Sequence, residues 1–336
     1  MMMKYESSNE SVADFYAGKS VFVTGGTGYL GKVLLEKLLY SCEKLDKIYL
    51  LIREKKNVSP EKRLQNIFEQ PIFKRLKSER ADYVRKVVPI VGDISEPNLG
   101  ITEEDEKELR EKVSVVFHLA ATVRFNEPLK VAMNINFEGT KRVLNLCKKM
   151  KQLPTFVYVS TAYSNANLEI IEEVIYPPPA YYEDVYTALQ QYGDNDKEIR
   201  KLWFVPSKNE PSEGWIDNWF GATSIVFMVG KGHYRVLAGA SSNLFDLMPV
   251  DYVSNLTIVA AAKCKGYVKL QRKVLKLNDT YQYFTSRSWV MDSKKTQALY
   301  ASLSALDKNL FPFNPVNIVW SEYLPVYYKG VKTYLF

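Results

Sequence analysis

Hydrophobic and polar positions follow two different periods along the first half of the chain. Short runs of β-branched and apolar residues, typical of buried strands, are separated by stretches in which apolar residues recur every three or four positions, as on one face of a helix. Five strands are predicted in this part of the chain: Ser20–Thr24, Lys47–Arg53, Val87–Ile94, Val113–Ala121 and Phe156–Thr161. Regular alternation of strand and helix predicts an α/β fold built on a doubly wound parallel sheet.

Helical periodicity fills the intervals between these strands. The stretch Tyr29–Tyr40 carries leucine at every fourth position, which predicts a helix with one buried face. Pro60–Lys77 has a similar apolar side, and Pro128–Met150 is helical in period. A further helix is expected to begin near Thr102, because acidic residues follow this hydroxyl and favour the positive end of a helix dipole.

The pattern changes beyond Thr161. Pro177–Pro179 interrupts regular structure, and Asn243–Ala262 contains a turn followed by a helical pattern. From Phe284 onward the chain is rich in aromatic residues at helical spacing. These changes predict a large α/β domain at residues 1–262, a basic linker at 263–283 and a small C-terminal helical domain at 284–336.

Composition narrows the class of protein. The chain is 46% apolar and 25% charged, as in globular proteins, and no apolar run reaches the ~18 residues that cross a bilayer. The first residues have no apolar signal region, so we do not expect secretion. The chain has 3 cysteines without CxxC spacing and only 2 histidines, so no metal site is predicted, and His118 is expected to be packed rather than catalytic. A net charge of +7 favours an anionic partner.

The strongest chemical signal is a glycine-rich turn between the first strand and the first helix. Its letters, TGGTGYLG, have the GxxGxxG spacing of a dinucleotide-binding turn. Glycine lets the backbone approach a pyrophosphate, and the helix N-terminus supplies N–H groups and a positive dipole end. A turn without a ligand is the alternative. The residues expected to contact a cofactor are Thr24, Gly25, Gly26, Thr27, Gly28, Tyr29, Leu30 and Gly31.

The end of the second strand indicates which dinucleotide is bound. NAD-binding proteins place an acidic residue here, on the ribose 2′-hydroxyl. This chain has Arg53, followed by Lys55 and Lys56. A guanidinium group pairs with a 2′-phosphate, which an acid would repel, so NADPH is the predicted cofactor. An exposed arginine at a strand end is the alternative.

Other candidate residues lie at the ends of the later strands. Asp93 is expected to accept a hydrogen bond from the adenine amino group or, equally well, to form a turn. The small side chains of Ala120 and Ala121 let the chain pass beside the cofactor. Ser160 and Thr161 are catalytic candidates, since a hydroxyl there can bind a carbonyl oxygen during reduction. Capping of the strand end is the competing interpretation of these two hydroxyls.

Together these residues resemble the extended short-chain dehydrogenase/reductase superfamily, which implies a Rossmann-type sheet. Several longer strings are similar to segments of fatty acyl-CoA reductases, particularly the insect members. They occur in family order along nearly the whole chain: Val21–Cys42, Lys47–Arg53, Val91–Gly100, Val116–Pro128, Tyr158–Asn165, Glu172–Pro179, Gly214–Asn218, Pro249–Asn255 and Phe284–Leu335.

This resemblance implies an activity and a location. Fatty acyl-CoA reductases use two NADPH to reduce a long-chain fatty acyl-CoA to a primary alcohol through an aldehyde. The resemblance therefore implies an oxidoreductase of lipid metabolism, with fatty acyl-CoA as substrate and no nucleic acid as partner. It also implies association with a membrane surface, on the cytosolic side of the endoplasmic reticulum or peroxisome. No transmembrane span is expected in this chain.

One part of the family pattern is missing. Reduction of a carbonyl leaves charge on oxygen, and the resemblance implies that a tyrosine supplies the proton while a lysine four residues later lowers the tyrosine pKa. No Tyr-xxx-Lys pair lies in the helical stretch expected directly after Pro177–Pro179. The pairs that exist, Tyr40 with Lys44 and Tyr328 with Lys332, lie elsewhere in the chain.

The omission is concentrated at two places. Trp203 is followed directly by Phe204, where the missing helix is expected, and a second stretch is absent around Lys263–Lys269. The reductase domain is therefore expected to be incomplete after about residue 203. Three interpretations follow: an active reductase with a displaced acid, a non-catalytic NADP-binding scaffold, and a chain shortened by splicing or gene-model error, which we favour. A sugar-nucleotide epimerase or dehydratase is the alternative enzyme class.

Overall fold

The fold is described from a computed structural model. The described residues are 4–5, 10–54, 58–80, 82–123, 128–152, 154–161, 170–176, 182–183, 186–187, 248–265 and 290–335.

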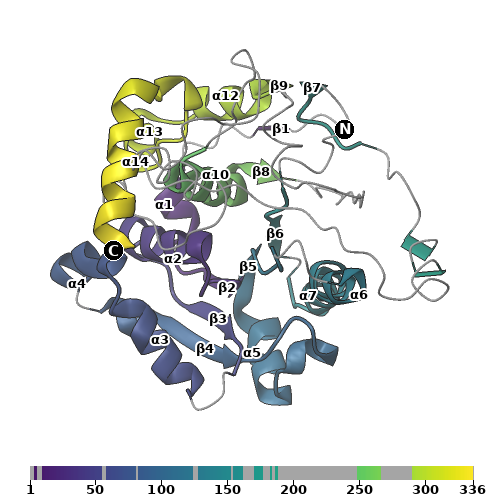
Figure 1. Ribbon diagram of the computed structural model, residues 1–336. Coiled ribbons are helices and arrows are strands. Elements are labelled where there is room, and N and C mark those ends of the chain that lie inside the picture. Colours follow the sequence, from purple (N-terminus) through teal and green to yellow (C-terminus); the bar gives the residue numbers. More distant parts are fainter. Residues whose placement is uncertain are drawn as a thin grey trace.

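A five-stranded parallel sheet forms the centre of the described structure (Figure 1), with strand order β4-β3-β2-β5-β6. The strands are β2 Ser20–Thr24, β3 Ile48–Ile52, β4 Val87–Val91, β5 Val113–His118 and β6 Thr155–Tyr158. Every neighbouring pair is parallel. The predicted α/β class and doubly wound sheet are confirmed. Most strands end before the predicted residue, because the chain leaves the sheet there to form the loops of the candidate site.

Alternating side chains of the strands enter two separate hydrophobic cores, one on each face of the sheet. In β2, Val21 and Val23 belong to the first core and Phe22 to the second. In β3, Leu50 and Tyr49 are divided in the same way. Successive side chains of a strand point to opposite faces, so two apolar faces require a helical layer on each side.

Helices that contribute buried residues to the first core include α1 Val12–Phe15, α2 Tyr29–Ser41, α3 Pro60–Phe68, α4 Lys74–Glu79 and α10 Val250–Lys263. The second core is covered by α5 Glu103–Lys112 and α7 Gly139–Lys148. Helix α7 is preceded by α6 Leu129–Ala132 and by a π-helical segment, η4, at Met133–Glu138. The predicted helix start at Thr102 is confirmed, since its side chain accepts a hydrogen bond from the Asp105 N–H at 3.1 Å.

The stretch Pro60–Lys77, predicted as one continuous helical pattern, is divided in the structure. It is broken at Pro71, which begins a 3-10 turn, η1, over Pro71–Phe73. A proline has no N–H for the helix and disfavours helical geometry in the residue before it. Both halves still bury their apolar side in the first core. Two further 3-10 turns, η2 Tyr83–Lys86 and η3 Pro97–Gly100, flank β4.

The C-terminal part is helical and packs onto the helices that cover the first core, including α2 and α10. It contains α12 Lys294–Ala301, α13 Ala305–Leu310, the turn η6 Pro315–Asn317 and α14 Trp320–Tyr334 (Figure 1). Its buried residues belong to the same first core as those of α2 and α10. The helices predicted in the C-terminal part are present, while its division into a separate domain, with boundaries at residues 262 and 283, stays a prediction.

Buried hydrogen bonds reinforce this packing. The Val12 N–H donates to the buried carboxylate of Asp307 at 3.0 Å, and the Tyr16 hydroxyl donates to the Ile258 carbonyl at 2.7 Å.

Two small sheets lie outside the main one: β7 Ile170–Ile171 pairs with β9 Val290–Met291, and β1 Lys4–Tyr5 pairs with β8 Cys264–Lys265. Over the ranges that the structure describes, no helix is long and apolar enough to cross a membrane.

Candidate cofactor and active site

The glycine-rich turn leaves the carboxyl end of β2 in a conformation that requires glycine. Gly25 has φ +76°, in the left-handed region. A Cβ at this residue would lie 2.6 Å from the Ala120 nitrogen and 2.7 Å from the Leu119 carbonyl carbon. The turn after β2 therefore lies directly against the loop after β5, which brings two parts of the predicted site together.

The same turn fits closely against the first residues of α2. A Cβ at Gly31 would lie 2.3 Å from the Gly25 oxygen and 2.4 Å from the Gly26 Cα. Gly28 precedes the helix and is exposed, and as a glycine it has no side chain to cap the N–H groups that begin α2. An exposed backbone at a helix N-terminus is the arrangement that binds a pyrophosphate. The described residues therefore fit a dinucleotide at this position.

A buried histidine connects this turn to the helix after β5. The Nδ1 atom of His118 lies 2.6 Å from the Thr24 hydroxyl, and its Nε2 atom lies 3.0 Å from the Thr140 hydroxyl. Thr140 donates its hydroxyl proton to the Asn136 carbonyl at 2.7 Å. Thr140 must therefore accept from Nε2–H, which leaves Nδ1 as the acceptor of the Thr24 proton.

This network and its burial give His118 a structural role, so we do not expect it to donate a proton during a carbonyl reduction. Its side chain is fully buried, and burial lowers the pKa of the imidazole from 6.5 to about 4. It is neutral at physiological pH. The Ala120 N–H donates to the Thr24 hydroxyl at 3.4 Å, so His118 orients the threonine that holds the loop after β5. The interpretation of His118 as a packed histidine agrees with this geometry.

Two arginine side chains lie at the end of β3, Arg53 directly after the strand and Arg63 on α3. The Arg53 side chain is 64% exposed, and its guanidinium lies 3.6 Å from the Asp93 carboxylate at the end of β4. Arg63, on α3, donates to the Arg53 carbonyl oxygen. Burial and the neighbouring charge of Arg53 both lower the pKa of Arg63. Sequence analysis missed Arg63, because it joins the site only through the packing of α3.

Asp93 is fixed by its own turn. One carboxylate oxygen accepts hydrogen bonds from the Ser95 N–H at 2.9 Å and the Ser95 hydroxyl at 2.8 Å. The other oxygen faces Arg53. The turn interpretation of Asp93 agrees with these bonds, while its contact with the adenine amino group stays a prediction.

The hydroxyl candidates follow β6. Ser160 is exposed and Thr161 is half-buried, two and three residues beyond the strand end at Tyr158. Val159 still donates to the His118 carbonyl at 3.0 Å, so the two loops leave the sheet side by side. Other residues named from the sequence lie outside the described residues: Lys55, Lys56, Ala162, Tyr163, Trp203 and Phe204.

A second residue missed by sequence analysis is Asn136, in the π-helical segment η4. Its side-chain oxygen accepts from the Thr122 N–H at 2.7 Å, and its amide donates to the Thr122 carbonyl at 3.1 Å. These two bonds fix the loop that follows Ala120 and Ala121. Asn136 was not predicted, because the helical pattern of this region does not indicate the π-helical segment that contains this residue.

Two solved structures share the fold. The terminal R domain of the myxalamid PKS-NRPS pathway has a TM-score of 0.59 at 18% identity, covering 94% of this chain and 91% of that one. UDP-glucuronic acid 4-epimerase from Bacillus cereus, in complex with NAD, has a TM-score of 0.56 at 16% identity, covering 94% and 99%. These identities show a shared Rossmann-type fold. The epimerase alternative therefore has support from the fold alone.

The family is shown by closer matches. The NAD-binding family model described as "Male sterility protein" matches residues 23–209 and 199–257, and a second model with that description matches 247–336. Fatty acyl-CoA reductase 1 from Xenopus laevis is 30% identical over 447 residues, covering 97% of this chain and 86% of the relative. The protein is thus an oxidoreductase of the extended short-chain type with a nicotinamide cofactor domain. The chain belongs to the fatty acyl-CoA reductase family, as its motifs predicted.

Proposed function

We propose that the protein is built for NADPH-dependent reduction of a long-chain fatty acyl-CoA to a primary alcohol through an aldehyde. The observation that carries this proposal is the match to fatty acyl-CoA reductase 1 over 97% of the chain. The glycine-rich turn supplies the cofactor site that such a reaction requires. When bound, NADPH supplies hydride to the carbonyl carbon of the substrate.

The chain's own residues would hold the cofactor and orient the carbonyl group. Exposed backbone at Gly28 and the N-terminus of α2 bind the pyrophosphate, while the loop at Ala120 and Ala121 lies beside it. Ser160 and Thr161 donate hydrogen bonds to the substrate oxygen as negative charge develops there. Donors placed in this way stabilise that charge without reorganisation during the reaction.

The preference for NADPH rests on Arg53 and Arg63. Their guanidinium groups place two positive charges at the end of β3, where the Asp93 carboxylate pairs with Arg53. Arg53→Asp should weaken NADPH binding by on the order of 1.5–3 kcal/mol, because a charge-assisted phosphate pairing is lost. NADH binding should hardly change. Titration of both proteins with both cofactors tests this, and equal affinity of the parent for NADPH and NADH would contradict it.

A further part of the proposal is that this chain reduces acyl-CoA poorly because it lacks the segment with Tyr-xxx-Lys. The Xenopus alignment extends over 447 residues although the whole chain has 336, so over a hundred aligned residues of the relative have no counterpart. The two matches of the NAD-binding model meet at residues 199–209, around Trp203 and Phe204. Loss of a positioned proton donor typically lowers a rate by ~10²–10⁴.

The test combines an assay with a restored chain. Purified protein is incubated with NADPH and palmitoyl-CoA, and aldehyde and alcohol are measured. Transcripts are sequenced across the codons for Trp203 and Phe204. We expect little alcohol from the chain as written, a longer transcript that encodes Tyr-xxx-Lys, and restored reduction by its product. Cofactor binding without turnover by either form would instead favour a scaffold role. Normal turnover by the short chain would refute the impairment.

Location is a separate part of the proposal. We propose that the protein acts at a membrane surface on the cytosolic side of the endoplasmic reticulum or peroxisome. The net charge of +7 and the low solubility of the alcohol product support this location. Fractionation of cells that express the tagged chain tests it, and recovery with neither membrane would contradict it.

A further inference from the structure

The amino end of the main sheet carries a row of lysines. Four strands are each preceded directly by lysine, at Lys19 before β2, Lys47 before β3, Lys86 before β4 and Lys112 before β5. These strands are parallel, so all four lysines lie at one end of the sheet. A five-residue strand is about 16 Å long, which separates this end from the glycine-rich turn.

The lysines of this row differ in how their charge is balanced. Lys112 lies 2.9 Å from the Glu108 carboxylate. By contrast, Lys47 donates to the Arg85 carbonyl at 2.8 Å, and Lys86 donates to the Leu45 carbonyl at 2.7 Å. A carbonyl group fixes the position of an ammonium group but does not neutralise its charge. Lys47 and Lys86, directly before β3 and β4, are therefore held by contacts that leave their positive charge in place.

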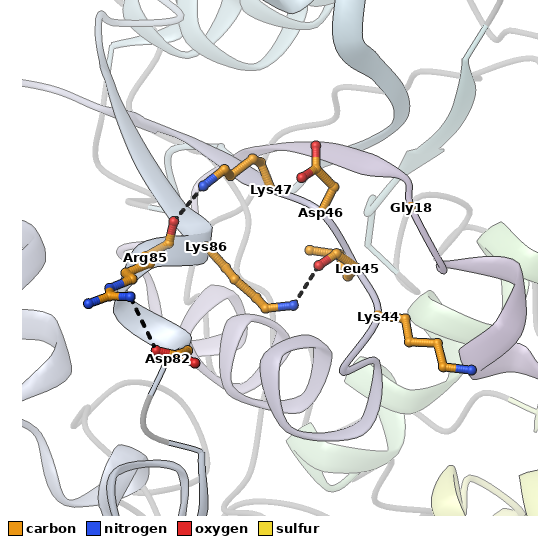
Figure 2. Close-up of a pocket in the computed structure, with 8 residues that line it drawn as sticks. All are labelled: Gly18, Lys44, Leu45, Asp46, Lys47, Asp82, Arg85 and Lys86. Carbon is orange, nitrogen blue, oxygen red and sulfur yellow. Dashed lines mark hydrogen bonds and ion pairs between the residues drawn. The ribbon is translucent and has the colours of Figure 1, made fainter.

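A cavity of about 640 Å³ lies at this position. Figure 2 shows Lys47 and Lys86 reaching between the two segments that form its walls, the loop before β3 and the turn before β4. Lys44 and Arg85 also line it. Two carboxylates line the same cavity: Asp46 accepts from the Ser20 hydroxyl at 2.8 Å, and Asp82 lies 3.7 Å from Arg85 in an exposed pair.

We propose that this cavity binds a phosphate group of a second ligand, at a site separate from the cofactor turn. A phosphate carries one or two negative charges on several oxygens, so it can accept hydrogen bonds from more than one cation at once. Lys47 and Lys86 are already held in position by backbone carbonyls. Lys44 is exposed and the Arg85 side chain is 86% exposed, and both line the same cavity. The site does not depend on the reductase activity.

Either a phospholipid headgroup or a soluble phosphate ester supplies this chemistry, and the experiment separates them. The full chain is titrated with vesicles of phosphatidylcholine with and without phosphatidic acid, and separately with glycerol 3-phosphate. The test variant is Lys44→Glu with Arg85→Glu, both exposed at the cavity. The control is Lys329→Glu with Lys332→Glu on α14, which changes the net charge equally.

We expect the test variant to bind phosphate about tenfold more weakly or worse, with NADPH affinity and thermal unfolding unchanged. A loss confined to the acidic vesicles identifies a lipid headgroup, whereas a loss with glycerol 3-phosphate as well identifies a general phosphate site. The proposal is overturned if the parent binds neither probe, if the test variant binds both probes as the parent does, or if the control loses as much as the test variant.

Discussion

At the carboxyl end of the main sheet the backbone is packed against itself, whereas at the amino end long side chains reach between neighbouring loops. Gly25 leaves no room for a Cβ beside Ala120, and the histidine that orders this region is neutral. At the amino end, Lys47 and Lys86 remain charged and bond to carbonyls across a cavity. We expect the carboxyl end of the sheet to bind its ligand through close backbone contact, whereas the amino end presents side-chain charge.

The sharpest test of this difference uses two glycines in the same backbone conformation. Gly25 has φ +76° and Gly18, at the amino end, has φ +68°. A Cβ at Gly25 would lie 2.6 Å from a backbone nitrogen, but a Cβ at Gly18 would meet no atom within 4 Å. Alanine should cost each position about 1–2 kcal/mol of conformational energy. Only Gly25→Ala should also lower NADPH affinity, by about 100-fold or more.

Both variants are compared by NADPH titration and by urea unfolding. Gly18→Ala acts as the matched control, since it has the same backbone strain without the steric clash. The close-contact account of the carboxyl end predicts that the two variants differ strongly in cofactor affinity. Equal affinities for NADPH in Gly25→Ala and Gly18→Ala would contradict that account.

The next largest effect concerns the neutral state of His118. The unfolded chain protonates this side chain near pH 6.5, but burial lowers its pKa to about 4 in the folded protein. Between these values the unfolded state binds more protons, so the free energy of unfolding falls as pH falls. The loss should reach about 3 kcal/mol below pH 4. Chemical unfolding between pH 7 and pH 4.5 measures it.

His118→Asn should remove most of this pH dependence, because asparagine does not titrate. The matched control is the only other histidine, His233, which lies outside the described residues. His233→Asn measures how much of the slope is lost when a histidine elsewhere in the sequence is removed. Carboxylates also titrate in this range, but they do so in all three proteins and cancel in the comparison. An unchanged slope in His118→Asn would contradict a neutral buried imidazole.

The two ends of the sheet also differ in how well the sequence predicted them. The glycine-rich turn between β2 and α2 was predicted correctly, because its spacing is local and its conformation requires glycine at Gly25, while the cofactor contacts of its residues stay predictions. Arg63 and Asn136 were missed, since each enters the site through the packing of a helix that its local pattern does not specify. The cavity at the amino end was missed for the same reason. Its cations come from residues 44–47 and 85–86, which only strand pairing brings together.

The smallest predicted effect tests whether the lysines at the amino end stabilise the fold or only present charge. Lys86 donates to the carbonyls of Glu43 and Leu45, so Lys86→Met should lower the free energy of unfolding by about 1–3 kcal/mol. Lys44 is an exposed cation of the same cavity, and Lys44→Met should change the free energy of unfolding by less than about 0.5 kcal/mol.

Neither variant should change NADPH affinity, because the cofactor turn lies at the other end of the strands. Urea unfolding of both variants measures the change in stability, and NADPH titration measures the cofactor affinity. Equal stabilities would mean that the carbonyl contacts of Lys86 contribute nothing measurable, and a loss of NADPH affinity in either would show that the two ends of the sheet are coupled.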